Sequence, residues 1–107
     1  MGSRHVFHVA TLADWEAARS AGTYTTSTYG VSLAQEGFLH ASREDQWRGV
    51  LERFYADVTE PLVLLVIDPD LVGVPLVEES PAPGVAETFP HLYGALDPAA
   101  VVEVRPL

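Results

Sequence analysis

The first twenty residues change from a two-residue to a helical pattern of apolar positions. Arg4 to Ala10 alternates between two faces, which predicts a first strand. Thr11, with Asp14 three residues later, resembles a capping box that opens a helix, and Gly22 is expected to end it. The apolar stripe of this helix consists of Leu12, Trp15 and Ala18. A strand followed by a helix is therefore predicted here.

A polar segment and a second strand–helix pair follow. Residues 23–29 are rich in Thr, Ser and Tyr and predict a long loop or a lid, and 31–36 predicts one helical turn before Gly37. Residues 38–41 predict the second strand, and Ser42 with Asp45 predicts a capped helix that continues to about residue 56. Its stripe consists of Trp47, Val50, Leu51 and Phe54, the spacing of a helix packed on a core.

The second half of the chain favours strands. The continuous apolar run 62–67 predicts a buried central strand, closed by a turn at Asp68-Pro69-Asp70. Shorter strands are expected at 74–79 and 101–105, a proline-containing loop at 80–84, and an irregular aromatic segment at 87–94. Two main helices early and most strands late predict a small α+β protein, a single domain over residues 1–107.

Composition and charge narrow the function. Fifteen acidic residues against six arginines give a formal net charge of −9, and the arginines are scattered, which argues against nucleic-acid or anionic membrane partners. No apolar run approaches the roughly 20 residues of a membrane span. The chain has no cysteine and no recognisable signal peptide, so we expect a cytoplasmic protein. Without Lys or Cys, catalysis would rest on His, acidic, hydroxyl or Arg side chains.

Two histidines stand out from their local context. In the predicted second strand, His40 and Ser42 share one face and point toward the start of the following helix, where free N–H groups favour an anionic ligand. His91 follows Pro90 in an aromatic segment that would present it from a rigid turn. The alternative is that His40 is a satisfied core histidine and Ser42 only a helix cap.

Four blocks of the chain resemble one bacterial family. The segments "FHVATLADWEAA", "GFLHAS", "LVLLVIDPD" and "FPHLYGAL" are similar, in order and spacing, to the family of domain of unknown function 952, over nearly the whole chain. That family is grouped by fold with the ADP-ribosyltransferases, including RNA 2′-phosphotransferases, which use NAD in a cleft between split sheets. The resemblance therefore implies an ADP-ribosyltransferase-like fold, with split antiparallel or mixed sheets.

The resemblance also implies site residues. The family's recurrent histidines fall on His8, His40 and His91, with Ser42 and Tyr93 beside them. As an enzyme, the protein would hold an NAD ribose with His8, bind phosphate or ribose with His40 and Ser42, and use His91 or Glu78 at the reacting carbon. Val77-Glu78 replaces the family's usual Trp-Glu, so an aromatic that could stack on the ligand is missing there.

Two other readings of the same residues stay open. A non-catalytic module could bind a small polar metabolite in the same cleft, without turnover. A metal could be held by three imidazoles and a carboxylate, His8, His40, His91 and Glu78. None of these four residues has the short i, i+2 or i, i+4 spacing typical of metal sites, so we expect no metal. The sequence leaves the oligomeric state open.

Overall fold

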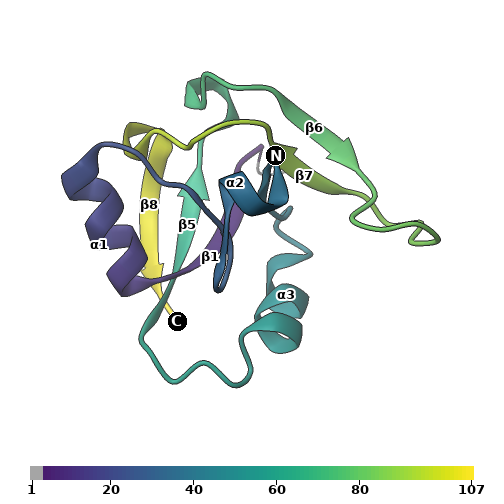
Figure 1. The fold of residues 1–107 in the computed structure, drawn as a ribbon, viewed down its shortest axis with the longest axis horizontal. Coiled ribbons are helices and arrows are strands. Elements are labelled where there is room, and N and C mark those ends of the chain that lie inside the picture. The colour runs from purple at the N-terminus through teal and green to yellow at the C-terminus, as the bar shows by residue number, and fades with distance from the viewer. Residues whose placement is uncertain (1–3) are drawn as a thin grey trace.

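A three-stranded antiparallel sheet organises the computed structural model, which describes residues 4–107 (Figure 1). Strand β5 (Leu62–Ile67) lies between β1 (Val6–Thr11) and β8 (Val101–Pro106). β5 is the apolar run that the sequence predicted as a central strand, and every residue after Leu62 in it is buried. All of β1 is buried as well, and it pairs with β5 along its whole length. Two strands that are buried on both faces thus form the centre of the fold.

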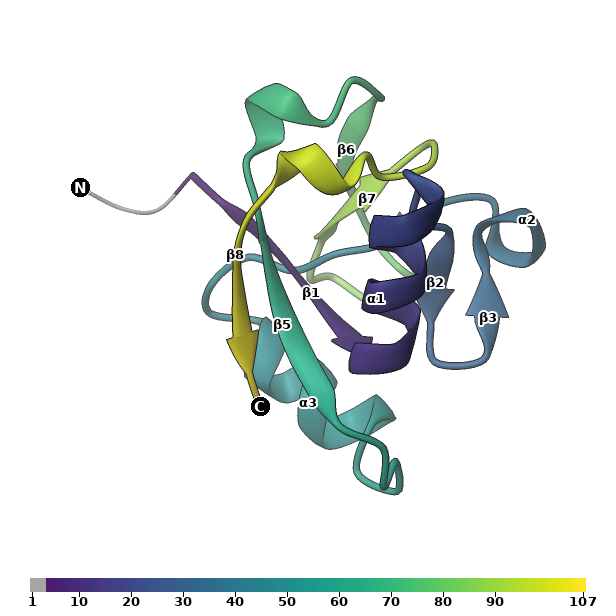
Figure 2. The ribbon, with the colours of Figure 1, turned by 90° about the vertical axis from the view of Figure 1, so that its left-hand side faces the viewer.

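Two helices cover the opposite faces of this sheet (Figures 1 and 2). Trp15 and Ala18 of α1 (Leu12–Ala21) pack into one apolar cluster, and Trp47 of α3 (Trp47–Phe54) packs into the other. The predicted start and end of α1 are confirmed: Thr11 Oγ1 accepts a hydrogen bond from the Asp14 N–H at 3.1 Å, and the following glycine is left-handed.

A second antiparallel sheet places β7 (Phe89–Leu92) between β4 (Leu39–His40) and β6 (Leu76–Glu79). The prediction that residues 87–94 are irregular was therefore wrong. It rested on Pro90, because proline gives no N–H to a ladder and is rare in central strands. Here the Pro90 carbonyl still accepts from the Ala41 N–H at 3.0 Å, which joins β7 to the end of β4.

The polar segment 23–29 is neither a loop nor a lid. It contains β2 (Thr26–Thr28), which pairs with β3 (Val31–Ser32), and its Tyr24 and Ser27 side chains are buried. The predicted helical turn is confirmed as α2 (Leu33–Glu36), which begins with a capping box at Ser32 and ends at Gly37 with φ of 93°. The hydroxyl-rich composition suggested a surface loop, whereas Tyr24 and Ser27 are buried and hold this hairpin to the rest of the protein.

Ser42 does not cap a helix. Its N–H and C=O both bond to the main chain of Phe7, at 2.7 and 2.8 Å, so the backbone stays extended at this point. A turn follows in which Gln46 Oε1 accepts from the Arg43 N–H at 2.9 Å, and α3 begins only at Trp47. The predicted helix is thus shorter at both ends, because a pairing with β1 takes the place of the first helical turn.

The remaining elements are two short 3₁₀ helices, η1 (Pro69–Leu71) and η2 (Pro98–Ala100). The predicted α+β class is confirmed, and every strand pairing among residues 4–107 is antiparallel. Within the same residues, no helix has the length and apolar character needed to cross a membrane.

The two predicted caps give contrasting mutational outcomes. Thr11→Ala removes the hydrogen bond to the α1 N-terminus and is expected to lower the free energy of unfolding by about 1 kcal/mol. Ser42→Ala, at a site that caps nothing, is expected to change it by less than half as much. Urea denaturation of both variants measures the difference in unfolding free energy. Equal losses would contradict the conclusion that Thr11 caps a helix and Ser42 does not.

Candidate ligand-binding site

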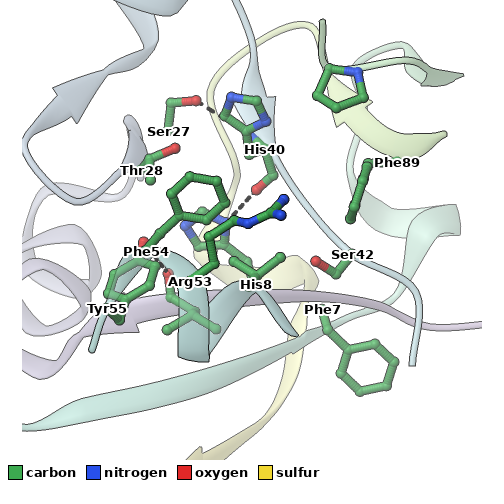
Figure 3. Close-up of a pocket in the computed structure, with 13 residues that line it drawn as sticks. Phe7, His8, Ser27, Thr28, His40, Ser42, Arg53, Phe54, Tyr55 and Phe89 are labelled. Carbon is green, nitrogen blue, oxygen red and sulfur yellow. Dashed lines mark hydrogen bonds between the residues drawn. The ribbon is translucent and has the colours of Figure 1, made fainter. Parts of the chain in front are cut away.

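A cavity of about 140 Å³ lies where β1, β4 and α3 meet (Figure 3). Its wall is mostly apolar and aromatic, with a few polar groups. The apolar part comes from Phe7, Val9, Val50, Phe54, Tyr55, Pro81 and Phe89, and the polar part from His8, Ser27, Thr28, His40, Ser42 and Arg53. An apolar cavity with a small number of polar groups is the usual form of a small-molecule site.

Arg53 is the cationic group of this cavity. In Figure 3 its side chain extends from α3 into the space between His40, Ser42 and Phe89. Four of the six arginines form ion pairs with carboxylates, but Arg53 has no such partner within residues 4–107. In a chain with net charge −9, an arginine without a carboxylate beside an apolar cavity favours an anionic ligand group.

Phe54 belongs to the mouth of the cavity. The helical stripe predicted it as a core residue, and that prediction was wrong, because its side chain is 55% exposed. α3 ends at Phe54, and the other stripe residues pack against the sheet. An exposed aromatic ring next to a cavity provides a surface on which a flat ligand group can stack.

His40 and Ser42 line the cavity together, as their shared strand face predicted. The Ser42 residue is mostly buried but lines the cavity, where its Oγ is available to a hydrogen-bond partner. His40 Nε2 lies 3.1 Å from Glu36 Oε1, while burial lowers the pKa of the imidazole more than this carboxylate raises it. His40 is thus neutral at pH 7, and it and Ser42 can offer hydrogen bonds without charge.

His8 uses both ring nitrogens inside the protein. Nδ1 lies 2.5 Å from the His40 carbonyl oxygen, and Nε2 lies 2.8 Å from the Tyr24 hydroxyl. Because a carbonyl can only accept, Nδ1 carries the proton and Nε2 accepts from Tyr24. Burial is the main cause that lowers the pKa of His8 to about 4, and burial also raises the pKa of Tyr24, so both stay neutral at pH 7. No nitrogen of His8 is left for a ribose hydroxyl.

His91 lies next to the cavity but does not line it. Its ring is 5.0 Å from that of His40, centroid to centroid, and is 1% exposed. Nδ1 is 2.9 Å from Glu79 Oε1, and the Tyr93 hydroxyl donates to the same oxygen. These two hydrogen bonds lower the pKa of Glu79, and the bond from Tyr93 has the larger effect. His91 and Tyr93 are therefore brought together by Glu79.

Glu78 lies apart from the histidines. It forms an ion pair with Arg43 and accepts a hydrogen bond from Thr88. The structure thus pairs His91 with Glu79 rather than with Glu78. Side chains alternate along β6, so Glu78 and Glu79 lie on opposite faces of the strand. The family motif matched Val77-Glu78, which is why the sequence analysis selected Glu78.

Sequence reasoning missed Arg53 and Glu79. The signal for Glu79 was present, because alternation from Val77 places it on the face of β6 that meets His91 across the ladder. Arg53 had no comparable signal. It lies one residue before Phe54 on the predicted helix, and an exposed arginine on a helix is typical of a solvated surface.

Residues 4–107 contain no group of three or more His, Asp or Glu side chains placed to hold a metal ion. Of the four residues considered as ligands from the sequence, His8 is bonded to a carbonyl and a hydroxyl, and Glu78 is bonded to Arg43. These side chains do not point to one centre.

The fold and the cavity define a small α+β protein with antiparallel sheets and a histidine- and arginine-containing cavity beside its main sheet. The chain belongs to a family described as protein of unknown function (DUF952), whose model matches residues 9–104. A search of curated proteins gives no match.

Solved structures of one bacterial protein share the fold. The crystal structure of protein CC0527 from Caulobacter crescentus is 26% identical and has a TM-score of 0.80, covering 96% of this chain and 85% of that one. A double mutant of CC0527 gives the same values. The solution NMR structure of CC0527 is 27% identical to this chain and has a TM-score of 0.75, covering 96% of this chain and 84% of that one.

The buried His8 predicts acid sensitivity. Burial lowers the pKa of His8 to about 4 in the folded protein, against about 6.5 for a solvated histidine, so the unfolded chain binds the proton more tightly. Stability therefore falls as the pH drops through this interval. Between pH 7 and pH 5 we expect His8 to cost roughly 2 kcal/mol of unfolding free energy. Urea denaturation at both pH values measures this loss.

The variant His8→Gln tests whether His8 causes this loss. His8→Gln, although less stable at pH 7, should lose less stability between pH 7 and pH 5 than the wild type does. An unchanged pH dependence in His8→Gln would show that another group senses the acid.

Proposed function

We propose that the protein binds a small nucleotide-like metabolite that carries one anionic group and one flat ring. The single observation that carries this proposal is Arg53, which lines a mostly apolar cavity and has no carboxylate partner within the described chain. Its guanidinium suits a phosphate or carboxylate, and an aromatic ring of the ligand suits Phe54 and Phe89. The neutral His40 and Ser42 would supply hydrogen bonds to the ligand.

The dimensions of the site favour part of a dinucleotide over a whole one. The cavity of about 140 Å³ is below the 300–1,000 Å³ or so that is usual for drug-sized ligands. An outer groove of about 540 Å³ along α3 shares Val50, Arg53, Phe54 and Phe89 with the cavity. A ligand anchored at Arg53 can therefore extend outward, along α3.

Charge limits what the outer groove accepts. Its rim includes Asp45, Glu52 and Glu87, which repel a second phosphate. A pyrophosphate such as that of NAD would place one phosphate at Arg53 and the other among these carboxylates. A mononucleotide avoids this repulsion, so we propose nucleoside monophosphates as the preferred class, with NAD, which the family resemblance implies, as a weaker ligand.

Binding is better supported than ADP-ribosyl transfer. The transfer reading assigns a ribose hydroxyl to His8, but both nitrogens of His8 are bonded within the protein. It also assigns Glu78 to the reacting carbon, while Glu78 is paired with Arg43. The cavity residues that remain available, His40, Ser42 and Arg53, are suited to holding a ligand.

The test compares AMP, nicotinamide mononucleotide and NAD by isothermal titration calorimetry and thermal unfolding. We expect the two mononucleotides to bind and to raise the melting temperature, with NAD weaker. Because a hydrogen bond to a charged group contributes about 1.5–3 kcal/mol, Arg53→Gln should weaken binding roughly tenfold to a hundredfold. Ser42→Ala should weaken it less.

The control is Arg48→Gln, which removes the same charge from the same helix. Arg48 stacks on Trp47, 4.4 Å from the ring centroid, and does not line the cavity. Its loss should leave ligand affinity within a factor of about two, as expected for a screened, distant charge. Equal losses in both arginine variants, or no binding of any of the three compounds at millimolar concentration, would refute the proposal.

A further inference from the structure

Strand β8 forms an open edge of the main sheet. It pairs with β5 on one side, and Figure 2 shows it along the outer margin of the sheet. Both α1 and α3 contact β1, on the far side of β5, more extensively than they contact β8. All residues of β8 after Val101 are exposed. An exposed edge strand is a template for pairing with another strand, so this edge is suited to a partner.

The pairing with β5 determines which main-chain groups of β8 face outward. The Leu107 N–H donates to the Leu62 carbonyl at 3.0 Å, and hydrogen-bonded positions alternate along an antiparallel pair. Arg105 therefore also faces β5, whereas Val104 directs its N–H and C=O away from the sheet. Pro106 faces outward as well, where its missing N–H costs no bond to β5. Val104 is thus the centre of the free edge.

The side chains of β8 are complementary to a second, antiparallel copy of the same strand. When two such strands meet with Val104 opposite Val104, each Glu103 lies opposite the partner's Arg105. Residues opposite each other at a non-hydrogen-bonded position have Cα atoms about 4.5 Å apart, close enough for an ion pair. Glu103 and Arg105 already pair within one strand, at 2.9 Å. Two copies in this register therefore bring their charges together as a ring of alternating sign.

Charge selects this register over its neighbours. Only positions whose main-chain groups face outward can hydrogen-bond across the edge, so the next registers shift one strand by two residues. One shift places Glu103 opposite Glu103 and the other places Arg105 opposite Arg105, and like charges directly opposite are destabilising. The apolar face fits the same register, because Val104, which is 37% exposed, meets its own copy there.

We propose that the protein forms a symmetric homodimer through β8, which joins two main sheets into one continuous antiparallel sheet. The two Val104 residues exchange a pair of N–H···O=C hydrogen bonds at the two-fold axis, and Glu103 and Arg105 fix the register. An isologous contact of this kind closes after two copies, which protects the edge from further pairing. Strand β8 contributes no residue to the cavity, so the dimer does not depend on ligand binding.

Sedimentation velocity over a range of protein concentrations tests the dimer. A single strand pair is a small interface, below about 1,200 Å², so we expect mostly monomer at about 1 μM and mostly dimer at about 1 mM. Arg105→Glu places like charges opposite each other and should weaken association at least about tenfold, as should Glu103→Arg. A wild type that stays monomeric at the highest concentration would overturn the proposal.

Mixing the two charge variants tests the register. Arg105→Glu has two acidic residues at the edge and Glu103→Arg has two basic ones, so an equimolar mixture should form a heterodimer about as tight as the wild-type dimer. The double exchange E103R/R105E should form a homodimer again. The control is Arg19→Glu, which makes the same charge change at an exposed ion pair on α1 and should dimerise as the wild type does.

Three results would contradict the pairing of β8. They are a mixture or a double variant that stays monomeric, an Arg105→Glu variant that associates as the wild type does, and an equal loss of association in Arg19→Glu.

Amide hydrogen exchange locates the contact. The Val104 N–H faces water in the monomer and is bonded in the dimer, so its exchange should slow several-fold from the lowest to the highest concentration. In Arg105→Glu the same exchange should change far less with concentration. A dimer in which the Val104 N–H exchanges equally fast at all concentrations would show that another surface makes the contact.

Discussion

The His8 ring holds together three segments that lie far apart in the sequence. One nitrogen donates to the carbonyl of His40, and the other accepts from Tyr24, so β1 is joined to β4 and to the segment before β2. The bond from Tyr24 needs a neutral ring, because only an unprotonated Nε2 can accept, and burial keeps the ring neutral by lowering its pKa to about 4. The junction between β1 and the segment before β2 thus depends on the protonation state of His8.

Local signals predicted the elements whose ends are fixed by nearby residues. Thr11 and Asp14 interact across three residues, as do Ser32 and Gln35, and both helices begin where those residues stand. The apolar run of β5 was equally clear, because a strand buried on both faces has no polar position. In these cases the sequence pattern and the three-dimensional environment impose the same requirement.

Distant partners decided the elements that were predicted wrongly. Ser42 has the composition of a helix cap, but Phe7, 35 positions away, takes both of its main-chain groups. Pro90 indicates a loop in isolation, yet β4 and β6 hold it in a central strand. The rings of His40 and His91 lie 5.0 Å apart, although only His40 lines the cavity. The bond that occupies Nε2 of His8 comes from Tyr24, in a segment predicted as a surface loop.

The cavity wall divides into parts that differ in their freedom to vary. The sheet side includes His8, whose ring also maintains the fold, so a substitution there would disturb far more than ligand contact. The α3 side ends in Arg53 and Phe54, which are exposed and support no other part of the core. Substitutions in the last turn of α3 can therefore change which ligand is preferred, while the rest of the architecture is kept.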